Sequence, residues 1–171
     1  MRFFFPLFLI LIFISCQEQK KNEVQKIDES KLKLRIEEVQ KPSISMEDDI
    51  INSYVKQHNL TMQTSGSGLR YKISGEESDL ERISPGDWVD VKYNVGLING
   101  TPCYSGIKQF KVDNDHVEKG IHEGVKLMKK GQKAIFILPS HLAHGLMGDG
   151  NKIPPKAILI CELEVKSVKK S

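Results

Sequence analysis

The stretch from Trp88 to Leu97 constrains the fold of this 171-residue chain more than any other part of its sequence. Apolar side chains occupy every second position in it, at Val89, Val91, Tyr93, Val95 and Leu97. A period of two is typical of an antiparallel strand with one buried face and one face in water. Asn99-Gly100 follows, the dipeptide most typical of a tight hairpin turn. We therefore expect the chain to return beside this strand through residues 101–104, with a further short strand at 109–112.

The spacing of apolar residues changes between residues 118 and 130. Ile121, Val125 and Met128 stand at i, i+4 and i+7, and lysines and a glycine close the segment, which predicts one amphipathic helix. Apolar runs at 134–138 and 157–165 flank a loop from Pro139 to Pro155, and both are expected to be buried strands. Together with a first strand at 69–73, this order predicts an α+β fold with an antiparallel sheet.

The N-terminal segment combines Arg2, an apolar run over residues 3–14 and then Ser15-Cys16. The run is shorter than the about 20 residues that a transmembrane helix needs, so it predicts an export signal. A cysteine directly after a small residue at this position resembles the lipobox of bacterial lipoproteins. That resemblance implies removal of residues 1–15, acylation of Cys16 and anchoring to a bacterial membrane. An ordinary secretory signal is the alternative, and either one places the domain outside the cytoplasm.

Three segments are expected after the signal. Residues 16–44 are charged and lack aromatic side chains, which predicts a tether that does not pack into a core. Residues 45–64 contain a serine followed three positions later by an aspartate, together with apolar residues at helical spacing. This pattern predicts a short helix at about 46–58 and then a linker. The Ser-Gly repeat at 65–68 predicts a flexible joint at the start of the main domain, which would span residues 65–171.

Charge and histidine content limit the possible partners. The formal net charge is only +3, and no basic stretch is interleaved with aromatic residues, so no nucleic-acid partner is expected. The histidines suggest a metal site, most of all the pair His141 and His144 and the pair His116 and His122. Their loop context and the lack of assembled thiol or carboxylate ligands argue against it, so we expect no metal and no cofactor.

Several fragments, in this order and spacing, resemble the FKBP family of peptidyl-prolyl cis-trans isomerases over about residues 69–168. They are VDVKYNVGLINGT, the aromatic Phe110, HVEKGIHEGVKLMKKG and LPSHLAHGLMGDGNKIPPKAILICELEV. The resemblance implies a twisted antiparallel sheet wrapped over one short helix, with an apolar pocket between them. Ile153-Pro154-Pro155 would hold Ile153 rigidly at the pocket rim. Alternatively, the two prolines only prevent the loop from pairing with a sheet edge.

The chemistry implied by this family needs neither a nucleophile nor a metal. Rotation about an X-Pro bond crosses a barrier of roughly 18–20 kcal/mol that arises from amide resonance. An apolar pocket lowers this barrier when it binds the twisted amide more tightly than the planar one. The residues that agree with the family's pocket by position are Tyr93, Phe110, Val117 and Ile153.

Other positions depart from the family pattern. Cys103-Tyr104 stands in place of a Phe-Asp pair, and Glu118 replaces an isoleucine whose backbone N–H would still be available to a substrate. Three further replacements are Ile121 for a tryptophan, His144 for a tyrosine and Cys161 for a phenylalanine. These replacements remove aromatic area, so we expect a wider pocket and weak isomerase activity or none, rather than efficient turnover.

Cys103 and Cys161 fall where the family places aromatic side chains that line the pocket. We therefore expect both to lie at the substrate pocket, either as small buried apolar groups or, less favoured, as a disulfide. An exported compartment permits such a bridge.

These features predict a lipid-anchored, exported isomerase that acts on proline-containing segments of exported polypeptides. The alternative is an FKBP-like domain that binds peptides as a chaperone or assembly module without catalysis. Cys103-Tyr104-Ser105, HEGVKLMKKG and the LIC of the last strand are similar to FKBP-like lipoproteins associated with gliding motility.

Overall fold

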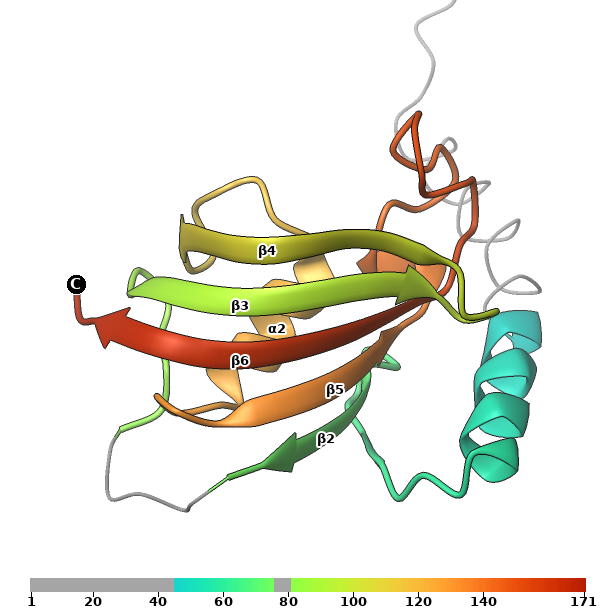
Figure 1. The fold of residues 1–171 in the computed structure, drawn as a ribbon, viewed down its shortest axis with the longest axis horizontal. Coiled ribbons are helices and arrows are strands. Elements are labelled where there is room, and N and C mark those ends of the chain that lie inside the picture. Colours follow the sequence, from blue (N-terminus) through green and yellow to red (C-terminus); the bar gives the residue numbers. More distant parts are fainter. Residues whose placement is uncertain (1–44, 76–80) are drawn as a thin grey trace, which may run out of the picture.

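The computed structural model describes residues 45–75 and 81–171, so the predicted signal and tether lie outside the described residues. One antiparallel sheet has the strand order β1-β2-β5-β6-β3-β4, and the short helix α2 (Lys119–Lys126) lies against one of its faces (Figure 1). The predicted α+β fold is confirmed. The strands are β1 (Gln63–Thr64), β2 (Arg70–Ser74), β3 (Trp88–Leu97), β4 (Pro102–Lys111), β5 (Lys133–Leu138) and β6 (Leu159–Lys169).

The alternating stretch forms β3, which pairs with β4 on one side and β6 on the other. The predicted turn follows it, with Leu97 N–H donating to the Thr101 carbonyl at 2.8 Å and Gly100 at a φ of 89°. The return strand β4 is continuous, whereas the sequence suggested two short strands. Its middle is exposed and does not alternate, but its backbone still pairs with β3, and Gly106 lies opposite Tyr93.

Helix α2 (Lys119–Lys126) ends earlier than the predicted limit of residue 130. The following turn has its own hydrogen bonds, since the Lys129 N–H donates to the Gln132 side chain at 2.8 Å and Gly131 has a φ of 84°. Two glycines let α2 approach the sheet. A Cβ atom at Gly124 would lie 2.4 Å from the ring of Phe136 on β5.

The main core lies between α2 and the sheet, where Phe110, Phe136 and Val125 are fully or almost fully buried. A second, smaller cluster is formed by the helix at residues 45–57, whose Ile51 packs with Ile137 and Ile158. This helix stands beside the end of the sheet at which the β3–β4 turn lies (Figure 1).

The loop of residues 139–155, called the flap here, connects β5 to the segment before β6. It begins with the short helix η1 (Ser140–Leu142). The predicted joint at 65–68 is hydrogen-bonded to both the flap and α2. The Ser67 carbonyl lies 3.0 Å from His141 Nε2, and the Ser67 hydroxyl donates to Glu123 at 2.7 Å.

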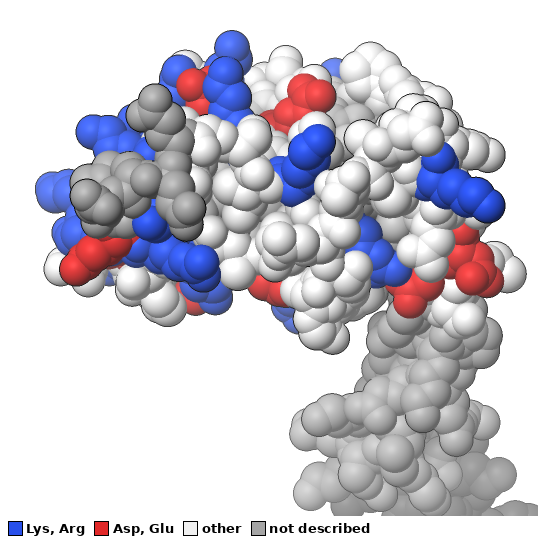
Figure 2. All heavy atoms as spheres, turned by 90° about the horizontal axis from the view of Figure 1, so that it is seen from below, with Lys and Arg blue, Asp and Glu red and all other residues white. Residues whose placement is uncertain are grey.

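Charged side chains of both signs are scattered over the face shown in Figure 2. Lysines and arginines are most frequent there at the end of the molecule where the C-terminus lies. In the described ranges, no helix combines the length and apolar composition needed to span a membrane.

Candidate active site

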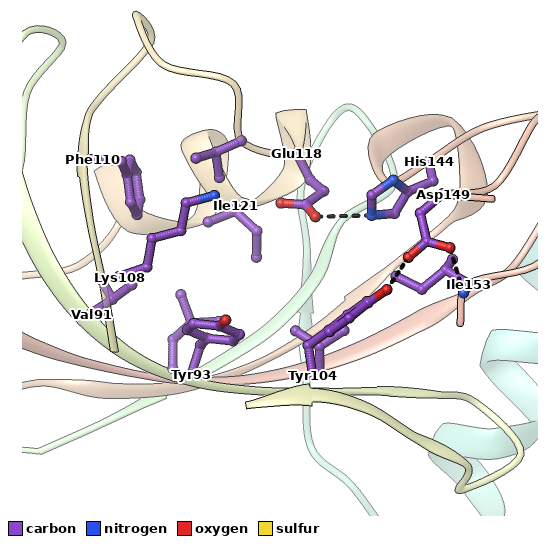
Figure 3. Close-up of a pocket in the computed structure, with 13 residues that line it drawn as sticks. Val91, Tyr93, Tyr104, Lys108, Phe110, Glu118, Ile121, His144, Asp149 and Ile153 are labelled. Atoms are coloured by element: carbon purple, nitrogen blue, oxygen red, sulfur yellow. Dashed lines mark hydrogen bonds and ion pairs between the residues drawn. The ribbon is translucent and has the colours of Figure 1, made fainter. Parts of the chain in front are cut away.

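A pocket of about 310 Å³ opens between the α2-facing side of the sheet, the start of α2 and the flap (Figure 3). The hollow is therefore not filled by the protein's own side chains. The sequence-predicted residues that line it are Tyr93, Tyr104, Phe110, Val117, Glu118, Ile121, His144 and Ile153.

The apolar walls come from four separate elements. Tyr93 extends from β3 and Phe110 from β4, while Ile121 comes from the first turn of α2 and Ile153 from the end of the flap. Phe110 is 1% exposed, Ile121 7% and Ile153 2%, so these side chains are held in place by packing around the cavity. The pocket thus presents a pre-formed apolar surface to a ligand.

His122 holds the segment that leads into the pocket, although it does not line the cavity. Its Nδ1 accepts a hydrogen bond from the Asp113 N–H at 3.1 Å, and its Nε2 lies 3.0 Å from the Asp115 carbonyl oxygen. Its ring also meets the ring of Phe110 edge-on, with 5.5 Å between the centroids. His122 therefore orients Phe110 rather than binding a ligand, and its expected neighbour His116 is exposed.

Glu118 and His144 face each other across one side of the pocket (Figure 3). Glu118 Oε1 lies 3.0 Å from His144 Nε2, and both side chains are partly exposed. Glu118 is the N-cap of α2, and its carbonyl accepts hydrogen bonds from the backbone N–H groups of Ile121 and His122. Its own N–H makes no hydrogen bond to any residue that the structure describes, so this donor is available to a ligand.

Tyr104 and Asp149 join β4 to the flap. The Tyr104 hydroxyl donates to Asp149 Oδ2 at 2.5 Å, and Asp149 Oδ1 accepts from the N–H groups of Asn151 and Ile153 at 2.8 Å each. The hydrogen bond from Tyr104, helped by these two N–H groups, lowers the pKa of Asp149 to about 2. The same bond raises the pKa of Tyr104, because an ionised Tyr104 has no proton left and could not donate this hydrogen bond to Asp149.

Cys103 and Cys161 are buried and both thiols are free, and neither is among the residues that line the pocket. Cys103 Sγ lies 3.8 Å from the Lys152 carbonyl oxygen, and Lys152 Nζ donates to the Cys103 carbonyl at 2.9 Å. Burial, as the largest cause, raises the pKa of the Cys161 thiol, so it stays protonated. Both cysteines behave as small groups in the core behind the pocket wall.

Sequence reasoning missed a further part of the lining: Val91, Val95, Lys108, Asp149 and Leu163. The alternation in β3 already places Val91 and Val95 on the same face as Tyr93, so that signal was present. Leu163 is opposite Tyr93 in the register between β3 and β6, which only the sheet pairing reveals. Nothing in the local sequence distinguishes Lys108 or Asp149 from solvent-facing residues.

The arrangement can bind an apolar group and hold a polar backbone beside it. Within residues 45–75 and 81–171, no group of histidine, cysteine, aspartate and glutamate side chains is placed to hold a metal ion. The polar groups at the rim, Glu118, His144 and Asp149, are engaged with one another or with the flap and with β4.

Comparison with known proteins links this pocket to a family. Residues 80–166 match the family described as FKBP-type peptidyl-prolyl cis-trans isomerase. A probable FKBP-type peptidyl-prolyl cis-trans isomerase of Haemophilus influenzae is 36% identical over 110 residues, which is 63% of this chain and 45% of that protein. FK506-binding protein 2 of Yarrowia lipolytica is 35% identical over 106 residues, which is 59% of this chain and 73% of that protein.

The fold comparison agrees with the sequence comparison. The crystal structure of FkpA from Escherichia coli matches with a TM-score of 0.63 and 27% sequence identity, over 82% of this chain and 66% of that chain. The match to a probable FkpA of Neisseria meningitidis covers 63% of this chain at 38% identity, but only 40% of that protein. The chain thus spans less than half the length of its relatives from Haemophilus influenzae and Neisseria meningitidis.

Proposed function

This chain belongs to the family of FKBP-type peptidyl-prolyl cis-trans isomerases, and from this premise we propose that it catalyses the rotation of X-Pro bonds in other polypeptides. The observation that carries the proposal is the open apolar pocket, in which side chains from two strands, α2 and the flap converge. Residues that the family resemblance implies by position, Tyr93, Phe110 and Ile153, all line it.

Catalysis in such a pocket is differential binding. The substrate's prolyl ring would rest against Tyr93, Phe110 and Ile121, in surroundings that exclude water from the adjacent amide. An amide in apolar surroundings loses part of the stabilisation of its planar, charge-separated form, so the twisted form becomes less unfavourable. The free backbone N–H of Glu118 would donate a hydrogen bond to the substrate's carbonyl oxygen, which fixes the peptide while the bond turns.

His144 supplies a second polar group at the rim. Its ring is oriented by Glu118 at 3.0 Å, so it can present a hydrogen-bond donor or acceptor to the substrate without free rotation. No proton has to be transferred, because isomerisation breaks no covalent bond. In this proposal Glu118 and His144 hold the substrate and have no acid–base role.

The substrates we propose are proline-containing segments of exported polypeptides, and the domain would be held at a membrane by a lipid on Cys16. This part rests on the N-terminal sequence, which lies outside the described residues. Cys16→Ser should abolish the incorporation of labelled lipid and release the chain from the membrane fraction. Unchanged labelling would contradict the anchor. The likeness to lipoproteins associated with gliding motility is retained as part of this proposal and rests on the sequence fragments alone.

A second candidate function is peptide binding without catalysis. It is favoured by the lining itself, because Ile121 supplies a smaller floor than an aromatic residue would, and the Glu118–His144 pair occupies part of the rim. A wider pocket would bind the planar and the twisted amide more equally, and uniform binding does not increase the rate.

A protease-coupled isomerisation assay on short X-Pro peptides separates the two candidates. The full chain is compared with Tyr93→Ala and His144→Ala, and with Lys169→Ala as a control, because Lys169 is exposed at the end of β6. We expect Tyr93→Ala to lower kcat/KM by about tenfold or more, since it removes a large wall of the pocket, and the control to have no effect. Equal rates for all four proteins, no faster than buffer, would reject catalysis and leave the binding function.

A further inference from the structure

The helix at residues 45–57 lies outside the segment that matches the isomerase family, yet it contributes a buried carboxylate to the flap. Glu47 is only 6% exposed. Its Oε2 accepts the Ser140 backbone N–H and its Oε1 accepts the Ser140 hydroxyl, each at 2.7 Å. Ser140 is the first residue of η1, at the beginning of the flap.

A buried carboxylate with these partners is a strong and specific contact. Among the described residues no lysine, arginine or histidine forms an ion pair with Glu47, so the two donors of Ser140 provide its hydrogen bonds. Hydrogen bonds to a charged group are stronger than neutral ones, and a buried carboxylate that lost them would be left unsatisfied. The helix is therefore fixed to one particular residue of the flap rather than resting on it through apolar contact alone.

Ser140 also connects Glu47 to the pocket through hydrogen bonds of its own backbone. Its carbonyl oxygen accepts the N–H groups of Ala143 at 3.0 Å and Gly145 at 2.8 Å, the two residues that flank His144. The Gly145 carbonyl in turn accepts the N–H of Lys156 at 2.8 Å, just after the two prolines that end the flap. One residue thus connects the helix both to the position of His144 and to the closing end of the flap.

We propose that Glu47 is a positioning residue for the isomerase pocket: through Ser140 it sets where the flap presents His144. The inference rests on the proposed function, because His144 matters only if the pocket binds a substrate. It extends the functional unit beyond the segment that matches the family, to a side chain more than thirty positions before that segment.

The simpler account is that the helix only adds stability. Its apolar contact, Ile51 against Ile137 and Ile158, would do so without any effect on His144. The two accounts differ in what the loss of Glu47 changes. A purely stabilising residue would alter the unfolding temperature, whereas a positioning residue would alter the dynamics of the segment around His144 and its contribution to activity.

The test compares Glu47→Ala with Asp49→Ala in the full chain. Asp49 lies on the same helix and is exposed, and its side chain makes no hydrogen bond or ion pair with the described residues, so it controls for loss of a carboxylate. Amide hydrogen exchange is followed at Ala143 and Gly145, and kcat/KM is measured for both variants, for His144→Ala and for the double variant Glu47→Ala/His144→Ala. Glu47→Gln is the conservative variant, because its amide can accept the Ser140 N–H and donate to the Ser140 hydroxyl.

We expect Glu47→Ala to accelerate exchange at Ala143 and Gly145 by about tenfold and to lower kcat/KM by a similar factor, since each unsatisfied buried group is costly. Asp49→Ala should change neither, and Glu47→Gln should restore most of both. The double variant should be no slower than His144→Ala alone, because Glu47 acts through His144.

Exchange at these two amides that is the same in Glu47→Ala and Asp49→Ala would overturn the proposal, and so would additive losses in the double variant. If the unmodified chain is inactive, the proposed function fails, and the exchange comparison still decides whether Glu47 positions the flap. If Glu47→Ala does not fold, Ser140→Ala removes one of the two contacts and the same exchange comparison applies.

Discussion

Tyr104 shows how a residue that departs from the family pattern can take on a different task at the same place. It stands where the family pattern has an aspartate, and its ring lines the pocket. Its hydroxyl also fixes the flap to β4 through Asp149, and Lys152 lies over its ring at 5.2 Å from the centroid. Asp149 in turn accepts a hydrogen bond from the Ile153 N–H, so the contact between Tyr104 and Asp149 helps to hold Ile153 at the pocket rim.

Tyr104→Phe should raise the pKa of Asp149 from about 2 towards the ordinary value of about 3.9, because the largest cause of the lowering is removed. A carboxyl pKa that is lower in the folded than in the unfolded state stabilises the fold above about pH 3.9, and this contribution is lost as the pH falls through about 2. An NMR titration of the Asp149 carboxyl carbon measures the change. Tyr71→Phe, on β2, is the control, and an unchanged titration in Tyr104→Phe would contradict the assignment.

Helix α2 illustrates how packing at the level of an element outweighs local preference. Glycine is unfavourable inside a helix by about 1 kcal/mol relative to alanine, yet α2 has glycines at positions 120 and 124. Both face β5, and a methyl group there would meet Leu138 or the ring of Phe136 at less than van der Waals distance. The close approach of α2 to β5 therefore depends on these two glycines.

Gly124→Ala should reduce the free energy of unfolding by about 1–3 kcal/mol, because an extra buried methyl group forces the helix away from the sheet. Helix propensity alone predicts the opposite sign, so the direction of the change decides which effect is larger. Urea denaturation gives the measurement, with Lys119→Ala at the exposed start of α2 as the control. If the Gly124→Ala chain were as stable as the unmodified one, α2 could not pack as closely against the Phe136 ring as the structure indicates.

At the scale of the whole molecule, the helix at residues 45–57 is packed as part of the same body as the sheet. Ile51 is completely buried against Ile137 of β5 and Ile158, and Arg70 of β2 forms an ion pair with Asp48 at 3.1 Å. The chain's one tryptophan, Trp88, lies at the start of β3, whereas the helix stands beside the opposite end of that strand.

Ile51→Ala should lower the free energy of unfolding by about 2–5 kcal/mol, the usual cost of a cavity at a buried aliphatic side chain. Because the helix and the sheet share a cluster, the urea midpoint seen by Trp88 fluorescence should fall although the substitution is remote from Trp88. Ser53→Ala, on the exposed side of the same helix, should leave it unchanged. An unaltered Trp88 transition in Ile51→Ala would mean that the helix unfolds independently.

Periodic features of the sequence predicted the fold and the apolar part of the site. The alternation in β3 and the helical spacing around Ile121 each arise because one face of the element is buried. Such one-sided burial leaves a periodic pattern of apolar residues that can be recognised in the amino-acid sequence. The polar contacts were not predictable in this way. Asp149 and Tyr104 are 45 positions apart, and Glu47 and Ser140 are 93 apart, so their pairing exists only after the sheet has formed. The end of α2 was misplaced because a side chain, Gln132, stabilises the turn after it.

The central claim is that the pocket lowers the barrier to prolyl rotation, and exchange NMR on an X-Pro peptide at equilibrium tests it most directly. Uncatalysed isomerisation takes tens to hundreds of seconds, so a peptide alone gives no cross-peaks between its cis and trans signals at sub-second mixing times. With a catalytic amount of the chain we predict such cross-peaks, and we predict that Phe110→Ala abolishes them. Shifts in the signals of Tyr93 and Ile121 on peptide addition, without any cross-peaks from the unmodified chain, would contradict the claim and identify a pocket that binds but does not catalyse.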